Sequence, residues 1–146
     1  MTSNLDNLVK VGTLKTEPGN QSEFDGLLDL ARNRLGDVSK GLSIESQFDL
    51  VYGSAHAFSL AAIRWHGYRP NNARFVVFQS LQHTLGVGPE VWRVLDKGHT
   101  LRNLAEYAGS FQVDKQLLAD MIGATKIIQA AVEKLGPIPP AKGKKK

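Results

Sequence analysis

The chain has 146 residues, of which 42% are hydrophobic and 22% charged, and its formal net charge is +4. This length suits one domain with its own core, and the composition is ordinary for a globular protein. The chain contains no cysteine, which excludes disulfides, thiolate zinc sites and cysteine nucleophiles. No apolar run approaches the length of a membrane span and no signal-peptide pattern is present, so we expect a cytoplasmic protein without a membrane partner.

The positive charge is concentrated at one end of the chain. Four lysines lie within the last five residues, and the remainder is nearly balanced. We interpret residues 137–146 as a solvated Pro/Lys-rich tail; the alternative is nonspecific attraction to phosphates. Residues 1–20 are polar and show no sustained period. We therefore expect a flexible N-terminal arm, with a short docking segment as the alternative, followed by a helical domain over residues 21–136.

Apolar residues recur at helical spacing in five segments, and no segment alternates in the manner of a strand. The segments cover about residues 22–36, 43–66, 73–85, 89–108 and 113–135. The second is apolar on two sides and rich in small residues, which is typical of a central helix that its neighbours approach closely. We therefore predict an all-α fold, a five-helix up-and-down bundle with short connections.

The fourth segment carries a crowded polar face over the stretch DKGHTLRNLAEY, residues 96–107. At about 100° per residue, its polar side chains fall on under half of the helix circumference; they are Asp96, His99, Arg102, Asn103, Glu106 and Tyr107. The opposite side collects the apolar residues Val94, Leu101, Leu104, Ala105 and Ala108, although Leu95 and Lys97 break the division. Gly98 indicates either a kink or a close backbone approach. A helix with one core face and one polar face indicates a surface site.

Three residues of this face have chemistry suited to a nucleotide or to RNA. Arg102 suits phosphate because its planar guanidinium donates two parallel hydrogen bonds and stays charged; the alternative is an ion pair with Glu106, one turn further on. Asn103 either orients a ribose or phosphate or satisfies a helix end. Tyr107 either stacks on a base or covers the edge of the core.

His99 is a candidate proton carrier because free histidine titrates near neutral pH, although a helical histidine is more often packed or solvated. Asp96 and Glu106 flank it, but the spacing of these ligands matches no zinc or calcium pattern. We therefore expect neither a metal nor a cofactor. Tyr68 and Arg69 lie in a turn, where an aromatic beside an arginine either holds a base with its phosphate or covers the edge of the core.

The order and spacing of these elements resemble the HEPN superfamily, a five-helix fold of nucleotide- and RNA-associated domains. The resemblance covers about residues 22–135. It rests on a long alanine-rich second helix that ends in His66-Gly67-Tyr68-Arg69-Pro70, and on a fourth helix that carries Arg102-Asn103-Leu104-Ala105-Glu106-Tyr107. Ribonucleases of the family show an arginine and a polar residue, then a histidine that takes part in RNA cleavage in a dimer cleft. Arg102 and Asn103 match the start of this motif, but position 107 holds tyrosine, as in other branches of the family.

The resemblance implies a noncatalytic HEPN-like homodimer that binds a nucleotide or RNA, or a protein partner such as a nucleotidyltransferase or an antitoxin, in a two-component module. We expect the ligand at Arg102, Asn103, Tyr107 and His99, with Asp96, Glu106, Tyr68 and Arg69 as secondary candidates. Two alternatives stay open. One is a metal-independent endoribonuclease in which His99 replaces the missing histidine, and the other is a helical protein that serves dimerisation alone.

Overall fold

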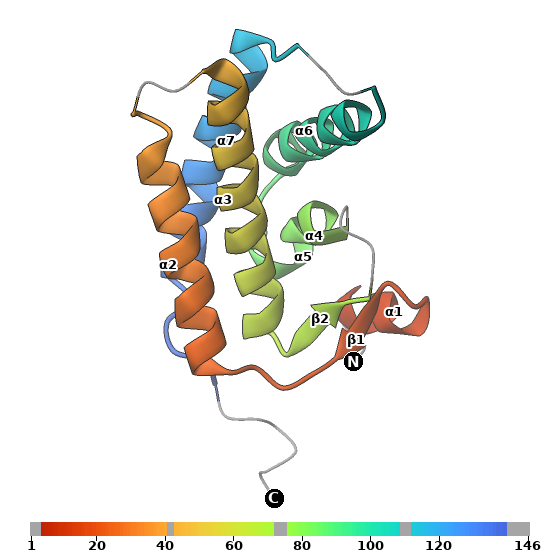
Figure 1. Ribbon diagram of the computed structural model, residues 1–146. Coiled ribbons are helices and arrows are strands. Elements are labelled where there is room, and N and C mark those ends of the chain that lie inside the picture. The colour runs from red at the N-terminus through yellow and green to blue at the C-terminus, as the bar shows by residue number, and fades with distance from the viewer. Residues whose placement is uncertain (1–3, 41–42, 72–75, 109–111, 140–146) are drawn as a thin grey trace, which may run out of the picture.

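The computed structural model describes residues 4–40, 43–71, 76–108 and 112–139, except for the side chains of residues 105–108. Helices form most of this part (Figure 1), so the all-α prediction is confirmed. In chain order the elements are α1 (Asn4–Lys10), β1 (Leu14–Thr16), α2 (Gln21–Asp37), α3 (Ile44–Trp65), β2 (Tyr68–Pro70), α4 (Val76–Gln79), α5 (Leu81–Thr84), α6 (Pro89–Ala108) and α7 (Lys115–Glu133). Among these residues, none of the helices combines the length and apolar character that a membrane span requires.

The five helices expected from the sequence correspond to α2, α3, the pair α4 and α5, α6, and α7. The third is divided at Ser80, whose buried hydroxyl donates to the carbonyl of Val77 at 2.9 Å and so competes with the helical hydrogen bonds. Helix α1 and the two strands were not predicted. With seven residues in the helix and three in each strand, these elements are too short to show a period in the sequence.

The central helix is α3, as predicted, and it contacts α2, α7, α4, α5 and α6. Figure 1 shows α2, α3 and α7 alongside one another, while α6 crosses them at a steep angle. Phe48, Phe58 and Ile63 of α3 are fully buried, and each such side chain contributes about 1.5–3 kcal/mol to stability. Ser54 permits the close approach of α2, because its buried hydroxyl donates to the carbonyl of Ala31 at 2.8 Å.

The N-terminal segment was expected to be a flexible arm, but residues 4–16 form α1 and β1 and pack against the helices. Leu5 and Leu14 are buried, with exposed fractions of 6% and 1%. Strand β1 pairs antiparallel with β2, and Leu14 lies opposite Pro70. Two isolated leucines carry no periodic signal, which is why the sequence pattern did not reveal this packing. The domain boundary at residue 21 and the C-terminal tail stay predictions.

The buried side of α6 agrees only in part with the one predicted: Val94 and Leu101 pack against the core, as expected. It runs through Leu95 and Gly98, whereas Leu104, which was expected in the core, is 59% exposed. Leu95, which interrupted the predicted division, is fully buried. Because His99 and Arg102 lie beside this buried line, they are half-buried and meet side chains of α3. The polar face of α6 is therefore in part an interface between helices.

Gly98 permits a close approach between α6 and α7. A Cβ atom at this position would lie 2.6 Å from Cε and 2.9 Å from Sδ of Met121, a fully buried residue of α7. Of the two roles that the sequence left open for this glycine, close approach is the one that the structure confirms.

Candidate functional site

A pocket of about 420 Å³ opens between α2, α3 and α6. Its lining consists of Arg34 from α2, Asp49, Leu50, Tyr52, Gly53 and His56 from α3, and Arg102 from α6. The volume falls within the range of small-molecule sites in proteins. Of the predicted ligand-binding residues whose side chains the structure describes, Arg102 is the one that lines this pocket. The polar side chains that accompany it come from helices that the sequence analysis had not connected with a site.

Arg102 is held in place by two neighbours on α3. Its Nη1 donates to Oδ1 of Asp49 at 3.1 Å, and its Cζ lies 4.9 Å from the ring centroid of Tyr52, within the range of a cation–π contact. Among the described residues, its other guanidinium nitrogens make no hydrogen bond. Arg102 is therefore oriented by the protein and still has donors for a ligand. The side chain of Glu106, its predicted alternative partner, lies outside the described residues.

Tyr52 is itself fixed by a chain of hydrogen bonds to α6. Its hydroxyl lies 3.0 Å from Nδ1 of His99, and Nε2 of His99 lies 3.2 Å from Nδ2 of Asn103. With Nδ2 of Asn103 as donor, a neutral His99 accepts at Nε2 and carries its ring proton on Nδ1, towards the tyrosine oxygen. The Tyr52 side chain is 3% exposed. His99 and Asn103 therefore lie behind the pocket and support the tyrosine under Arg102.

Arg34 brings a second guanidinium into the pocket. This half-buried side chain makes no hydrogen bond or ion pair with any other residue in the part of the chain that the structure describes. Its Nη1 lies 2.7 Å from the place that a Cβ atom would take at residue 53, so the guanidinium rests against α3 where Gly53 has no side chain. The pocket lining contains two arginines and one carboxylate, Asp49, so the pocket carries a net positive charge, which attracts anions.

Three more residues of α6 were predicted to belong to the site. Tyr107 and Glu106 belong to the helix, but their side chains lie outside the described residues, so their roles stay predictions. Asp96 is half-buried and does not line the pocket. Its side chain makes no hydrogen bond with another described residue.

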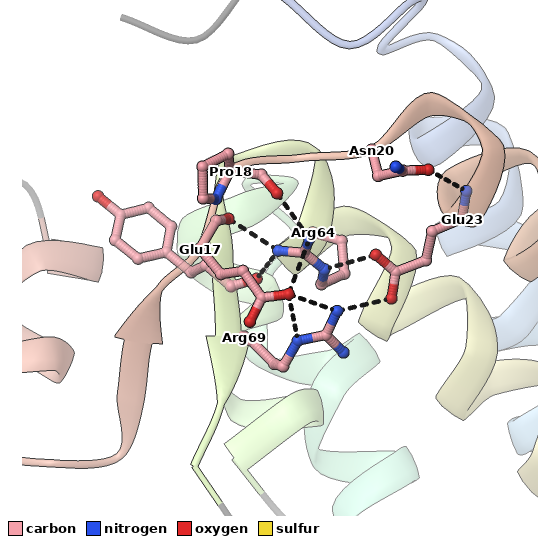
Figure 2. Close-up of polar contacts among 7 residues, drawn as sticks. Glu17, Pro18, Asn20, Glu23, Arg64 and Arg69 are labelled. Carbon is pink, nitrogen blue, oxygen red and sulfur yellow. Dashed lines mark hydrogen bonds and ion pairs between the residues drawn. The ribbon is translucent and has the colours of Figure 1, made fainter. Parts of the chain in front are cut away.

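Arg69, a secondary candidate, belongs to a cluster of two arginines and two glutamates (Figure 2). It donates to Glu17 at 2.9 Å and to Glu23 at 2.8 Å. Arg64 beside it is 1% exposed and donates to Glu23 at 2.9 Å and to the carbonyls of Glu17, Pro18 and Tyr68. This cluster joins the segment before α2 to the end of α3 and to β2.

The cluster shifts the acidities of its members. The hydrogen bond from Arg69 lowers the pKa of Glu17 below the ordinary value near 4.5. Burial opposes the charged form of Glu23, but hydrogen bonds from Arg69 and Arg64 outweigh it and lower the pKa of that carboxyl too. The two carboxylates in turn raise the pKa of Arg69. These shifts are those of a stable ion-pair network.

Tyr68, the residue before Arg69, also has a structural partner. Its hydroxyl donates to the carboxylate of Asp6 in α1, and its side chain is half-buried against the core. Tyr68 and Arg69 thus tie the N-terminal segment to β2. Of the two interpretations of this dipeptide, covering the edge of the core agrees with these contacts.

Arg34, Asp49 and Tyr52 were missed as site residues. Tyr52 fits the apolar stripe of a central helix, and Gly53 fits a run of small residues, so neither stood out. A glycine inside a helix costs about 1 kcal/mol relative to alanine, but it does not by itself show that another group lies against the helix, since Gly26 and Gly123 have nothing within 4 Å. The sequence contains no sign that Arg34 lies against Gly53, because the contact joins two separate helices.

Within the described ranges, no three histidine, aspartate or glutamate side chains come together as a metal-binding group. Comparison of the chain with family models, with curated proteins and with solved structures gave no match. The function must therefore be argued from the chemistry of the pocket.

Proposed function

We propose that the protein is a noncatalytic, HEPN-like homodimer that binds the phosphate of a nucleotide or of RNA in the pocket between α2, α3 and α6. Arg102 contacts the phosphate. Asn103 acts through His99, which keeps Tyr52 in place beneath the arginine. Tyr107 closes the cleft, as the resemblance implies.

The observation that carries this proposal is the state of Arg102. Asp49 and the ring of Tyr52 both contact its guanidinium, while most of its donors stay unused. A ligand that binds an arginine already oriented in this way loses little side-chain entropy. Phosphate is the natural ligand because its oxygens match the planar fork of a guanidinium.

The partner is proposed from the resemblance. A nucleotidyltransferase or an antitoxin in a two-component module agrees with the match of Arg102-Asn103 to the start of the family motif and with tyrosine at position 107.

Binding is favoured over the two alternatives by separate observations. Both ring nitrogens of His99 face protein groups, Tyr52 on one side and Asn103 on the other, whereas a general acid or base needs a nitrogen that faces the substrate. A protein that serves dimerisation alone leaves the two arginines of the pocket without a role.

The test is the substitution Arg102→Ala, with binding of AMP and of a fluorescent oligoadenylate RNA measured by calorimetry and anisotropy. We expect affinity to fall by about tenfold or more, since a charge-assisted contact is lost. The melting temperature changes little, because Asp49 is 60% exposed and an exposed ion pair contributes under about 1 kcal/mol. Arg93→Ala is the control, because Arg93 is an exposed arginine of α6 outside the pocket.

Unchanged affinity in Arg102→Ala contradicts the proposal. A melting temperature that falls in step with affinity assigns Arg102 to the fold instead. RNA cleavage in EDTA that disappears in His99→Ala supports the endoribonuclease alternative. Native mass spectrometry of the same protein tests the homodimer, and a monomer at micromolar concentration removes that part of the proposal.

A further inference from the structure

The pocket contains an arginine that the fold does not use. Arg34 has no hydrogen-bonding or ion-pair partner in the part of the chain that the structure describes, although it is half-buried. The carboxylate that lines the same pocket, Asp49, pairs with the other arginine, Arg102. A guanidinium kept in a pocket without its own counter-charge is a binding group for an anion.

The number of donors indicates which phosphate fits. The planar fork of Arg34 donates to two oxygens, and the unused nitrogens of Arg102 donate to a third. A terminal phosphate has three oxygens that carry no ester bond, whereas the phosphodiester inside an RNA chain has two. A phosphomonoester also carries about −1.5 to −2 charge at pH 7, so its attraction to the two arginines exceeds that of a singly charged diester.

We infer that the pocket takes the terminal phosphate of a mononucleotide-sized phosphomonoester, with Arg34 as its principal contact and Arg102 as its second. This inference rests on the proposed function and narrows its ligand class. The pocket volume of about 420 Å³ holds a ligand of that size. Gly53 is part of the site, because the missing side chain leaves the space in which the guanidinium of Arg34 lies.

The substitution Gly53→Ala tests this arrangement while every charge is kept. The new methyl group would lie 2.7 Å from Nη1 of Arg34, so the end of the arginine must move away from α3. We expect affinity for AMP to fall at least about threefold, because the displaced Arg34 loses its contact with the phosphate. Alanine favours the helix over glycine, so the melting temperature should stay the same or rise by roughly 2–4 °C. Gly53→Ala should therefore weaken AMP binding without lowering the stability of the fold.

Two further variants complete the experiment. Arg34→Ala should lower affinity for AMP by about tenfold with little change in stability, since no described residue pairs with it. Gly26→Ala is the matched control, because Gly26 also lies within a helix and a Cβ atom there would meet nothing within 4 Å. It should raise stability in the same way and leave affinity unchanged.

The choice of ligands separates this inference from the proposed function. We expect AMP to bind at least about tenfold more tightly than the diester ApA, and adenosine to bind weakest. Equal affinity for AMP and ApA, or AMP binding that Arg34→Ala and Gly53→Ala leave unchanged, overturns the inference. If RNA binds in a manner sensitive to Arg102→Ala, the proposed function stands even then. Absence of binding by AMP, ApA and RNA overturns both.

Discussion

At the scale of single residues, three arginines differ in how many of their donors the protein uses. Arg64 is buried and its nitrogens donate to a glutamate and to backbone carbonyls. Arg102 has one carboxylate partner, and Arg34 has none among the described residues. The first is committed to the fold, and the other two have donors left for a ligand. A guanidinium has five donors, so Arg34 and Arg102, which also line the pocket, can offer a ligand donors that Arg64 cannot.

Arg64, Arg69, Glu17 and Glu23 form one ion-pair cluster, which we call the Arg64 cluster. The lowered pKa values of its two glutamates predict that the fold loses stability in acid. Because folding lowers the pKa of Glu17 and of Glu23, the unfolded chain takes up protons first as the pH falls below about 5. The free energy of unfolding should therefore be highest above that pH and decline towards about pH 3. Glu23→Gln should lower stability at pH 7 and flatten this decline, as measured by urea unfolding at several pH values.

The control for that prediction is Glu45→Gln. Glu45 is exposed on α3 and has no ion pair with another described residue. If the free energy of unfolding depends on pH in the same way in both variants and in the original protein, the Arg64 cluster does not couple folding to protonation.

At the scale of elements, the long helices were predictable and the short ones were not. The bounds of α3 and α6 agree closely with the apolar period and with Ser43 and Pro89 at their starts. Part of the buried face of α6 was predicted wrongly. Leu95 is one apolar residue among several polar side chains, so it had little weight in the pattern. A helix that crosses its neighbours buries a short line of residues, and a periodic pattern averaged over the whole helix does not locate it.

Alanine substitution of two glycines, one at the contact between α6 and α7 and one away from it, should change stability in opposite directions. Gly98→Ala forces a methyl group against Met121 in a fully packed region, where overpacking costs about 1–3 kcal/mol; this exceeds the gain in helix propensity of about 1 kcal/mol. We expect a net loss of roughly 1 kcal/mol. Gly123→Ala lies in α7, with nothing within 4 Å of the new atom, and should be stabilising.

Urea unfolding of both variants measures the difference. Equal stabilisation by the two substitutions would mean that Met121 turns aside without cost, and that Gly98 is not required for the approach of α6 to α7.

At the scale of the whole molecule, the N-terminal segment belongs to the folded unit. Leu14 is 1% exposed, whereas Val11, three residues earlier, is 71% exposed. Leu14→Ala should therefore destabilise the entire domain by about 2–4 kcal/mol, and Val11→Ala should change its stability by less than about 0.5 kcal/mol. A single cooperative transition followed by circular dichroism measures both. A flexible arm would instead tolerate both substitutions equally.

The pairing of β1 with β2 also sets an order of events during synthesis. Glu17 and Arg69 are 52 residues apart in the chain, and so the first strand leaves the ribosome well before its partner exists. Until then Leu14 has no core to enter, and the glutamates of the Arg64 cluster have no arginines to bind. The segment that carries β1 is thus fixed in place only after α2, α3 and β2 have been synthesised.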